Sequence, residues 1–87
     1  MKVSQDFILR EVAGENFLIP VGQAALRVHG MVVISESGVL LWERLQTEQT
    51  VESLTEALLE EYDVDRETAY NDVTEFIKKL RQTGILE

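Results

Sequence analysis

The hydrophobic pattern of the chain changes at Ser35, and this change limits the possible folds more than any other sequence feature. Before Ser35, short apolar runs alternate with glycine-containing turns, a pattern typical of short β-strands. After Ser35, apolar residues recur at intervals of three and four, as on one face of an amphipathic helix. The sequence therefore predicts an α+β fold in which a small sheet precedes a helical part.

Three segments before the helical part are expected to be strands. "FILREV" at 7–12 and "NFLIPV" at 16–21 flank a loop of hairpin length that contains a glycine. "MVVIS" at 31–35 is the third strand, and "AALRV" at 24–28 is a candidate for a short further extended piece. Pro20 cannot donate a hydrogen bond within a sheet, so the second strand should either lie at an edge or end where Pro20 meets solvent.

Three helices are expected next, each opened by a side chain that can cap it. The caps and helices are Ser35 before 36–47, Thr50 before 51–61 and Asp65 before about 66–83. Gly84 is placed to end the third helix, and Ile85 can fold back on its last turn. The side chains expected to be buried are Val39, Leu40, Trp42 and Leu45 in the first helix, Val51, Leu54, Ala57 and Leu58 in the second, and Ala69, Val73, Phe76, Ile77 and Leu80 in the third.

Length and charge narrow the possible functions. The 87 residues suffice for one domain, 1–87, with strands within about 7–35 and helices within about 36–83. A formal net charge of −8 opposes binding to phosphates, so nucleic acid is not an expected partner. Residues 36–64 carry eight acidic side chains and one basic one, which we interpret as solvated helix faces. The start lacks the apolar stretch of a signal peptide and no apolar run approaches a membrane span, so we expect a cytoplasmic protein without a membrane partner.

Candidate catalytic residues are scarce, so we expect no enzyme activity, no metal and no cofactor. His29 is the single histidine, and there is no cysteine to join it in a metal site or to act as a thiol nucleophile. Ser35 and Ser37 flank a helix start and are better explained as capping residues than as nucleophiles. "SESG" at 35–38 lacks the lysine and the spacing of a phosphate-binding loop, although weak anion binding at a helix start remains an alternative.

The segment "MVVI" at 31–34 contains no charged residue and no proline, the features that usually protect an exposed strand edge. Either other strands of the chain cover it on both sides, or a partner does. Peptide capture by strand addition uses such an edge, because backbone hydrogen bonds supply affinity and neighbouring pockets select alternate side chains. We therefore interpret the segment as the docking strand of an interaction module.

Several short motifs follow one another along the chain. They are "ISESG" at 34–38, "LLWERL" at 40–45, "TV" at 50–51, "YDVD" at 62–65, "DV" at 72–73 and "LRQTGI" at 80–85. Their order and spacing resemble those of the PqqD-like family, whose namesake is the pyrroloquinoline quinone biosynthesis protein D and whose domain is also called the RiPP precursor peptide recognition element. The resemblance covers nearly the whole chain. Ser35 stands where relatives usually have asparagine, and "VGQAALRVHG" at 21–30 is longer than the tight hairpin of many relatives.

The resemblance implies a winged-helix-like fold, with a three-stranded antiparallel sheet followed by three helices. It also implies a non-catalytic function: binding the leader segment of a ribosomally synthesised precursor peptide and presenting the precursor to a modifying enzyme, often a radical S-adenosylmethionine protein. A winged-helix regulator that binds DNA is the alternative, and the net charge of −8 disfavours it. A dimer whose strand edges pair with each other is a third interpretation, so the choice between monomer and homodimer stays open.

The resemblance implies that the leader adds as a strand beside the third strand and packs against the third helix. The residues that we expect to contact it are Met31, Val32, Val33, Ile34 and Ser35 in the strand and Tyr70, Thr74, Ile77, Lys78 and Arg81 in the helix. The five helix residues lie beside a predicted core stripe of Ala69, Val73, Phe76 and Leu80. Helical spacing alone leaves open which flank of the helix faces the groove. Lys78 and Arg81 suit acidic residues of a leader, whereas Trp42 is expected to belong to the core.

Overall fold

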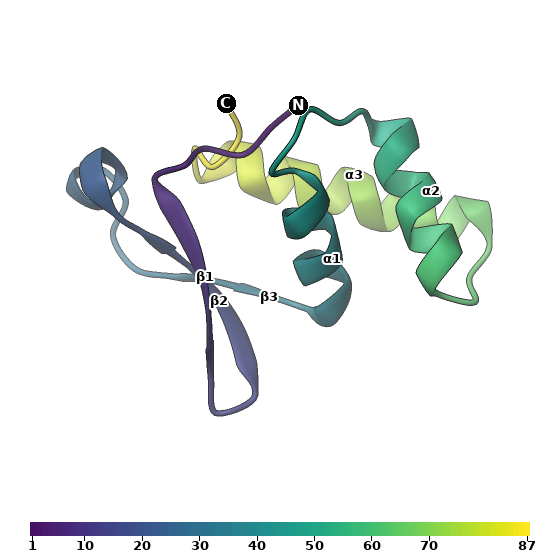
Figure 1. The fold of residues 1–87 in the computed structure, drawn as a ribbon, viewed down its shortest axis with the longest axis horizontal. Coiled ribbons are helices and arrows are strands. Elements are labelled where there is room, and N and C mark those ends of the chain that lie inside the picture. The colour runs from purple at the N-terminus through teal and green to yellow at the C-terminus, as the bar shows by residue number, and fades with distance from the viewer.

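The structure, a computed structural model, describes all 87 residues and contains a small sheet and a group of helices (Figure 1). The elements are β1 (Phe7–Val12), β2 (Glu15–Pro20), the 3-10 helix η1 (Gly22–Leu26), β3 (Val32–Ile34), α1 (Glu36–Arg44), α2 (Val51–Glu61) and α3 (Arg66–Gln82). The predicted α+β fold, with a three-stranded antiparallel sheet followed by three helices, is confirmed. None of the helices combines the length and the apolar character that crossing a membrane requires.

The sheet has the strand order β1-β2-β3, with both neighbouring pairs antiparallel. β1 and β2 pair over their full length and are joined by Ala13 and Gly14, whose φ values of 53° and 82° fit a type I′ turn. β3 pairs with β2 over three residues only. β2 is therefore the central strand, and β3 lies at an edge.

The prediction that the second strand lies at an edge is wrong, whereas the alternative that it ends at Pro20 is right. Pro20 is the last residue of β2 and lies opposite Phe7 of β1. β3 pairs no further along β2 than Leu18, so no hydrogen bond between these strands is lost at the proline.

The extended piece expected at 24–28 is also absent, because η1 occupies most of this segment. Gly22 has a φ of +56°, which turns the chain away from the end of β2. The carbonyl of Ala24 accepts hydrogen bonds from the N–H groups of Arg27 and Val28, and the Ala24 side chain is fully buried. Local hydrogen bonds and one core contact thus replace the neighbouring strand that an extended segment would need.

All three helices begin at the predicted caps. Ser35 Oγ accepts from the Gly38 N–H at 3.2 Å, Thr50 and Ser53 form a reciprocal capping box, and Asp65 Oδ1 accepts from the Thr68 N–H at 2.8 Å. The end of α3 is a Schellman motif: the N–H groups of Gly84 and Ile85 donate to the carbonyls of Arg81 and Leu80. α1 ends at Arg44, earlier than the predicted residue 47, because the following residues form i→i+3 turns instead.

The core lies where the sheet, η1 and the three helices meet. Its fifteen side chains are Val3, Phe7, Leu18, Ala24, Ile34, Leu41, Trp42, Leu45, Leu54, Leu58, Ala69, Val73, Ile77, Leu80 and Ile85. The two ends of the chain close it: Val3 bridges to Leu86, its N–H donates to the carbonyl of Leu45, and the Ser4 N–H donates to Ile85. Figure 1 shows the N-terminus and the C-terminus close together.

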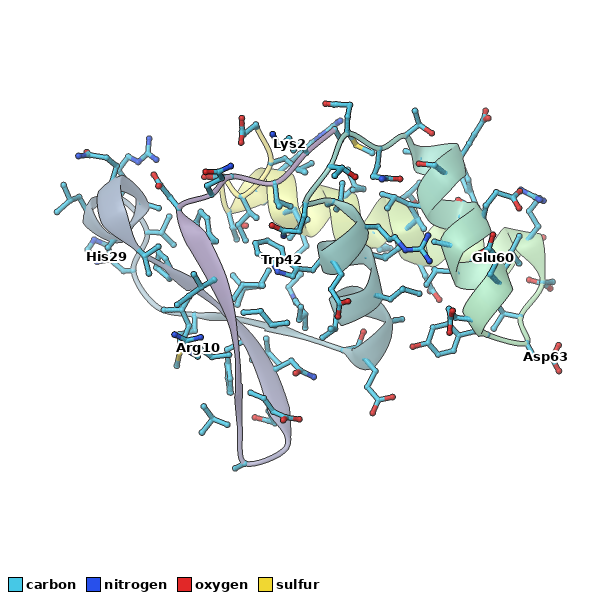
Figure 2. The ribbon with its side chains drawn as sticks, viewed as in Figure 1. Lys2, Arg10, His29, Trp42, Glu60 and Asp63 are labelled. Carbon is cyan, nitrogen blue, oxygen red and sulfur yellow. The ribbon has the colours of Figure 1, made fainter.

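Trp42 is a core residue, as predicted, with only 6% of its surface exposed. Figure 2 shows it in the middle of the molecule, between the sheet and the helices. We expect Trp42→Ala to lower the free energy of unfolding by about 3–5 kcal/mol, because truncating a buried aromatic leaves a cavity. Urea denaturation measures the change. Tyr70→Ala, at an exposed aromatic of α3, is the control and should change stability by no more than about 0.5 kcal/mol.

The stability that the Asp65 cap gives to α3 should depend on pH. Hydrogen bonds from Thr68, through its side chain and its backbone N–H, hold the pKa of Asp65 below its usual value because they favour the carboxylate. The carboxylate therefore stabilises the folded chain above the unfolded pKa of about 3.9, and this contribution is lost as the pH falls through the lower folded pKa.

Asp65→Asn keeps an acceptor at the cap but cannot titrate. The stability advantage of the native chain over Asp65→Asn should therefore be largest near pH 7 and should shrink as the pH falls below about 4. Urea denaturation of both proteins at several pH values measures it. A difference that does not change with pH would contradict the role assigned to the Asp65 carboxylate.

Candidate functional site

The backbone groups of Val33 face the open edge of β3. In a hairpin closed by a two-residue type I′ turn, the residues that flank the turn, here Val12 and Glu15, form a hydrogen-bonded pair. Because backbone groups alternate in direction along a strand, those of Asn16 and Leu18 point toward β3. Their partners in β3 lie on either side of Val33. Val33 itself therefore presents its N–H and C=O away from the sheet.

A side chain of α3 reaches this edge. Lys79 Nζ donates a hydrogen bond of 2.6 Å to the carbonyl oxygen of Val33, across 46 residues of sequence. This contact agrees with the direction derived from the strand alternation, since the carbonyl must face α3 to accept it. α3 thus faces the open edge of β3, and no further strand of the chain pairs with that edge.

A groove runs between these elements. One wall comes from the end of β3 and the start of α1, and the other from α3. The lining residues are Ser35, Ser37, Gly38 and Leu41 on the first wall and Asp72, Glu75, Phe76 and Lys79 on the second. The start of α1 faces the middle of α3, whereas β3 meets α3 further along at Lys79, so the two walls run in opposite chain directions.

Gly38 sets how closely the walls approach. A Cβ atom at this position would lie 3.1 Å from Ile34 Cβ and 3.1 Å from Phe76 Cε1. Both distances are shorter than ordinary van der Waals contact, so a residue with a side chain would push the Phe76 ring or the end of β3 outward. The absence of a side chain at Gly38 thus lets Phe76 form part of the groove wall.

The charged residues of the groove all lie on α3, with the acidic ones before the basic one along the chain. Asp72 and Glu75 provide two carboxylates, and Lys79 is the one cation in the lining. None of the three takes part in an ion pair, since the chain's two ion pairs join the Met1 amino group to Glu48 and Arg66 to Glu56. The groove therefore has an acidic end, whose carboxylates have no ion-pair partner, and a basic end, whose ammonium is hydrogen-bonded to the Val33 carbonyl.

A second hollow continues the groove beyond its acidic end. It shares Ser35, Ser37 and Asp72 with the groove and reaches the segment between α2 and α3. Tyr62 and Val64 in that segment are 38% and 39% exposed. An extended chain in the groove would meet an apolar surface there.

Of the five predicted strand residues, Ser35 lines the groove and Val33 lies at the open edge beside Lys79. Val33 is 48% exposed and Met31 58% exposed, and Val32 is partly buried. Ile34 is a core residue, only 5% exposed, so its side chain is not accessible. Ser35 lines the groove and caps α1.

The predicted helical residues do not face β3. Thr74, Ile77, Lys78 and Arg81 line a hollow beside α2, and Tyr70 lines another hollow between α2 and α3. Ile77 is 5% exposed and packs in the core, which sets the rotation of α3 about its axis. The flank chosen from helical spacing is therefore the one turned away from the open strand edge.

The flank that does face β3 consists of Asp72, Glu75, Phe76 and Lys79, none of which was predicted as a site residue. Phe76 was expected in the core stripe, but it is only partly buried and lies over Gly38. Lys79 follows Lys78 directly, and successive residues of a helix point about 100° apart. The apolar pattern could have identified this flank only if the exact centre of the buried stripe were known.

The titratable residues outside the groove do not gather into a metal site. No group of three or more His, Asp or Glu side chains is arranged to hold a metal ion. Figure 2 shows His29 beside η1, at the opposite end of the molecule from Glu60 and Asp63. The groove beside β3 is therefore the best candidate site.

Comparison with known families identifies the chain. The family model described as coenzyme PQQ synthesis protein D (PqqD) matches residues 22–86. The chain belongs to the PqqD family. The match includes β3 and all three helices, so both walls of the groove lie within the part that the PqqD family shares. No curated protein matches the chain.

Two solved structures have the fold of this PqqD-family chain. One is TbiB1 in complex with the TbiA(beta) leader peptide, with 25% sequence identity, a TM-score of 0.77 and coverage of 100% of this chain and 95% of TbiB1. The other is lasso peptide synthetase B1 complexed with the leader peptide, with 17% identity, a TM-score of 0.72 and coverage of 97% and 93%. The second likeness shows the fold alone. The first extends over the whole chain, including the β1–β2 hairpin that lies outside the family match.

Gly38→Ala tests the shape of the groove. Overpacking destabilises a protein by about 1–3 kcal/mol, whereas alanine has a higher helix propensity than glycine by about 1 kcal/mol. We therefore expect the free energy of unfolding to fall by up to about 2 kcal/mol. The resonances of Ile34 and Phe76 should shift, because the added methyl meets both. A more stable variant with an unshifted Phe76 ring would contradict the close contact. Chemical denaturation and NMR spectroscopy measure the two effects.

Proposed function

We propose that this PqqD-family chain is a non-catalytic module that captures the leader segment of a ribosomally synthesised precursor peptide and presents the precursor to a modifying enzyme. The observation that carries the proposal is the open backbone of Val33 beside the groove lined by α3. The fold of the chain supports the same proposal, because TbiB1, which has a similar fold and 25% sequence identity, was solved with a leader peptide bound.

The leader would bind by adding a strand to β3. Val33 offers one N–H and one C=O, and the next outward-facing backbone positions are 31 and 35, two residues away on either side. Alternate side chains of the added strand would enter the groove over Gly38 and Phe76, and the others would face solvent. The proposed binding residues are therefore 31–35 in the strand together with the groove flank of α3, in place of the flank expected from sequence.

The modifying enzyme would supply the chemistry. The chain has no cysteine and one histidine, and the Ser35 hydroxyl of the groove hydrogen-bonds to Ser37 Oγ and accepts from the Gly38 N–H. We propose a cytoplasmic radical S-adenosylmethionine enzyme as the partner, on the family resemblance. A DNA-binding function has less support, because the net charge is −8 and the groove adds two carboxylates against one lysine.

Titrating isotope-labelled protein with synthetic leader peptides tests the proposal. The peptides are taken from short open reading frames that neighbour the gene. We expect the amide resonances that shift to lie within 31–41 and 72–79, the ranges that contain β3 and the two walls of the groove. Shifts concentrated in 51–61 would instead locate binding on α2 and would contradict strand addition to β3.

Two adjacent lysines decide which flank of α3 contacts the peptide. Lys78→Glu and Lys79→Glu make the same charge change at neighbouring exposed positions, one beside α2 and one in the groove. We expect Lys79→Glu to weaken peptide binding at least about tenfold, or about 1.4 kcal/mol, and Lys78→Glu to change it less than about twofold. Calorimetric titration measures both, with circular dichroism as the control for folding. The reverse order would restore the flank predicted from sequence.

A further inference from the structure

We infer that the groove selects leaders by a pair of opposite charges: a carboxylate that contacts Lys79, and a cation that contacts Glu75, on peptide side chains two residues apart. The inference rests on the proposed function and specifies the peptide that the groove accepts. Lys79 has two successive partners in this scheme, the Val33 carbonyl in the free protein and the peptide carboxylate in the complex.

In the free protein, Lys79 is hydrogen-bonded to the backbone carbonyl that strand addition needs as an acceptor. Its ammonium donates to the Val33 carbonyl, which is the acceptor at the centre of the open edge. An arriving strand offers its own N–H to that carbonyl and displaces the ammonium. A displaced ammonium needs another acceptor, and a carboxylate is better than the carbonyl it leaves because hydrogen bonds between two ionised groups are the stronger ones.

At the other end of the groove, Glu75 and Asp72 lack cationic partners. Glu75 precedes Lys79 by four residues, a spacing that often joins glutamate and lysine on a helix, yet the Lys79 ammonium is on Val33 instead. Asp72 lies nearly another turn earlier on the same wall. Two unpaired carboxylates in one groove favour a basic side chain of the ligand.

The spacing of the wall matches the spacing of a strand. Four residues of helix separate Glu75 from Lys79, which is about 6 Å along the helix axis. Two residues of an extended strand span about 6.6 Å, and side chains two apart point to the same face. A strand that lies along α3 can therefore contact Lys79 with one groove-facing side chain and Glu75 with the next.

A displayed library of random 12-residue peptides tests the inference, with the unmodified protein, Lys79→Glu and Lys78→Glu as baits. We expect the unmodified protein to enrich an acidic and a basic residue separated by one position; their order reports the direction of the added strand. Lys79→Glu should exchange the acidic residue for a basic or neutral one. Lys78→Glu makes the same charge change beside α2 and should enrich the same pattern as the unmodified protein.

An enriched peptide is then synthesised with its acidic residue intact and with that residue changed to glutamine. The change should weaken binding to the unmodified protein about tenfold and binding to Lys79→Met less than about twofold, because the loss depends on the lysine charge. Carbonyl shifts of Val33 report the exchange of partners: they should change on peptide addition in the unmodified protein and should already differ in free Lys79→Met.

The outcomes separate this inference from the proposed function. If the enriched peptides shift the amides of 31–35 but carry no paired charges, strand capture stands and charge selection is wrong. Lys79 would then only protect the edge from other strands. If no bait enriches peptides, or if the enriched peptides leave 31–35 unshifted, the proposed function itself is wrong.

Discussion

The burial of one stripe of α3 determines most of what this chain can do. Ala69, Val73, Ile77 and Leu80 are almost fully buried, and together they set the rotation of α3 about its axis. That rotation turns Lys79 toward β3 and Lys78 toward α2, although the two lysines are adjacent in sequence. A small shift of the apolar stripe would place a different set of charges beside the open strand.

The open edge of β3 is a hazard that the chain manages by several means. β3 has only three residues, α3 lies along it, and the Lys79 ammonium covers its central carbonyl. Short edge strands and lysine side chains are common protections against uncontrolled pairing. At the central carbonyl the protection is a single flexible side chain, which a specific strand can displace. One contact thus serves the stability of the free protein and the access of a peptide.

Contacts between the two ends of the chain connect α1 and α3, the helices that supply the groove walls. The first residues cross the end of α1, where Val3 donates to Leu45, and they pair with the last residues, which follow the Schellman turn of α3. α1 supplies one wall of the groove and α3 the other, so these terminal contacts join the two walls outside the groove itself. A domain of 87 residues has a limited core, and such contacts are part of its stability.

Local chemistry made much of this protein predictable from sequence. The caps at Ser35, Thr50 and Asp65 and the glycine that ends α3 depend on neighbouring residues, and all were found where expected. The strand expected at 31–35 is present but shorter, at Val32–Ile34. The central position of β2, the 3-10 helix η1 and the groove-facing flank of α3 were decided only by the tertiary structure. Each depends on contacts between residues far apart in sequence, and periodicity defines the faces of an element without saying what each face will meet.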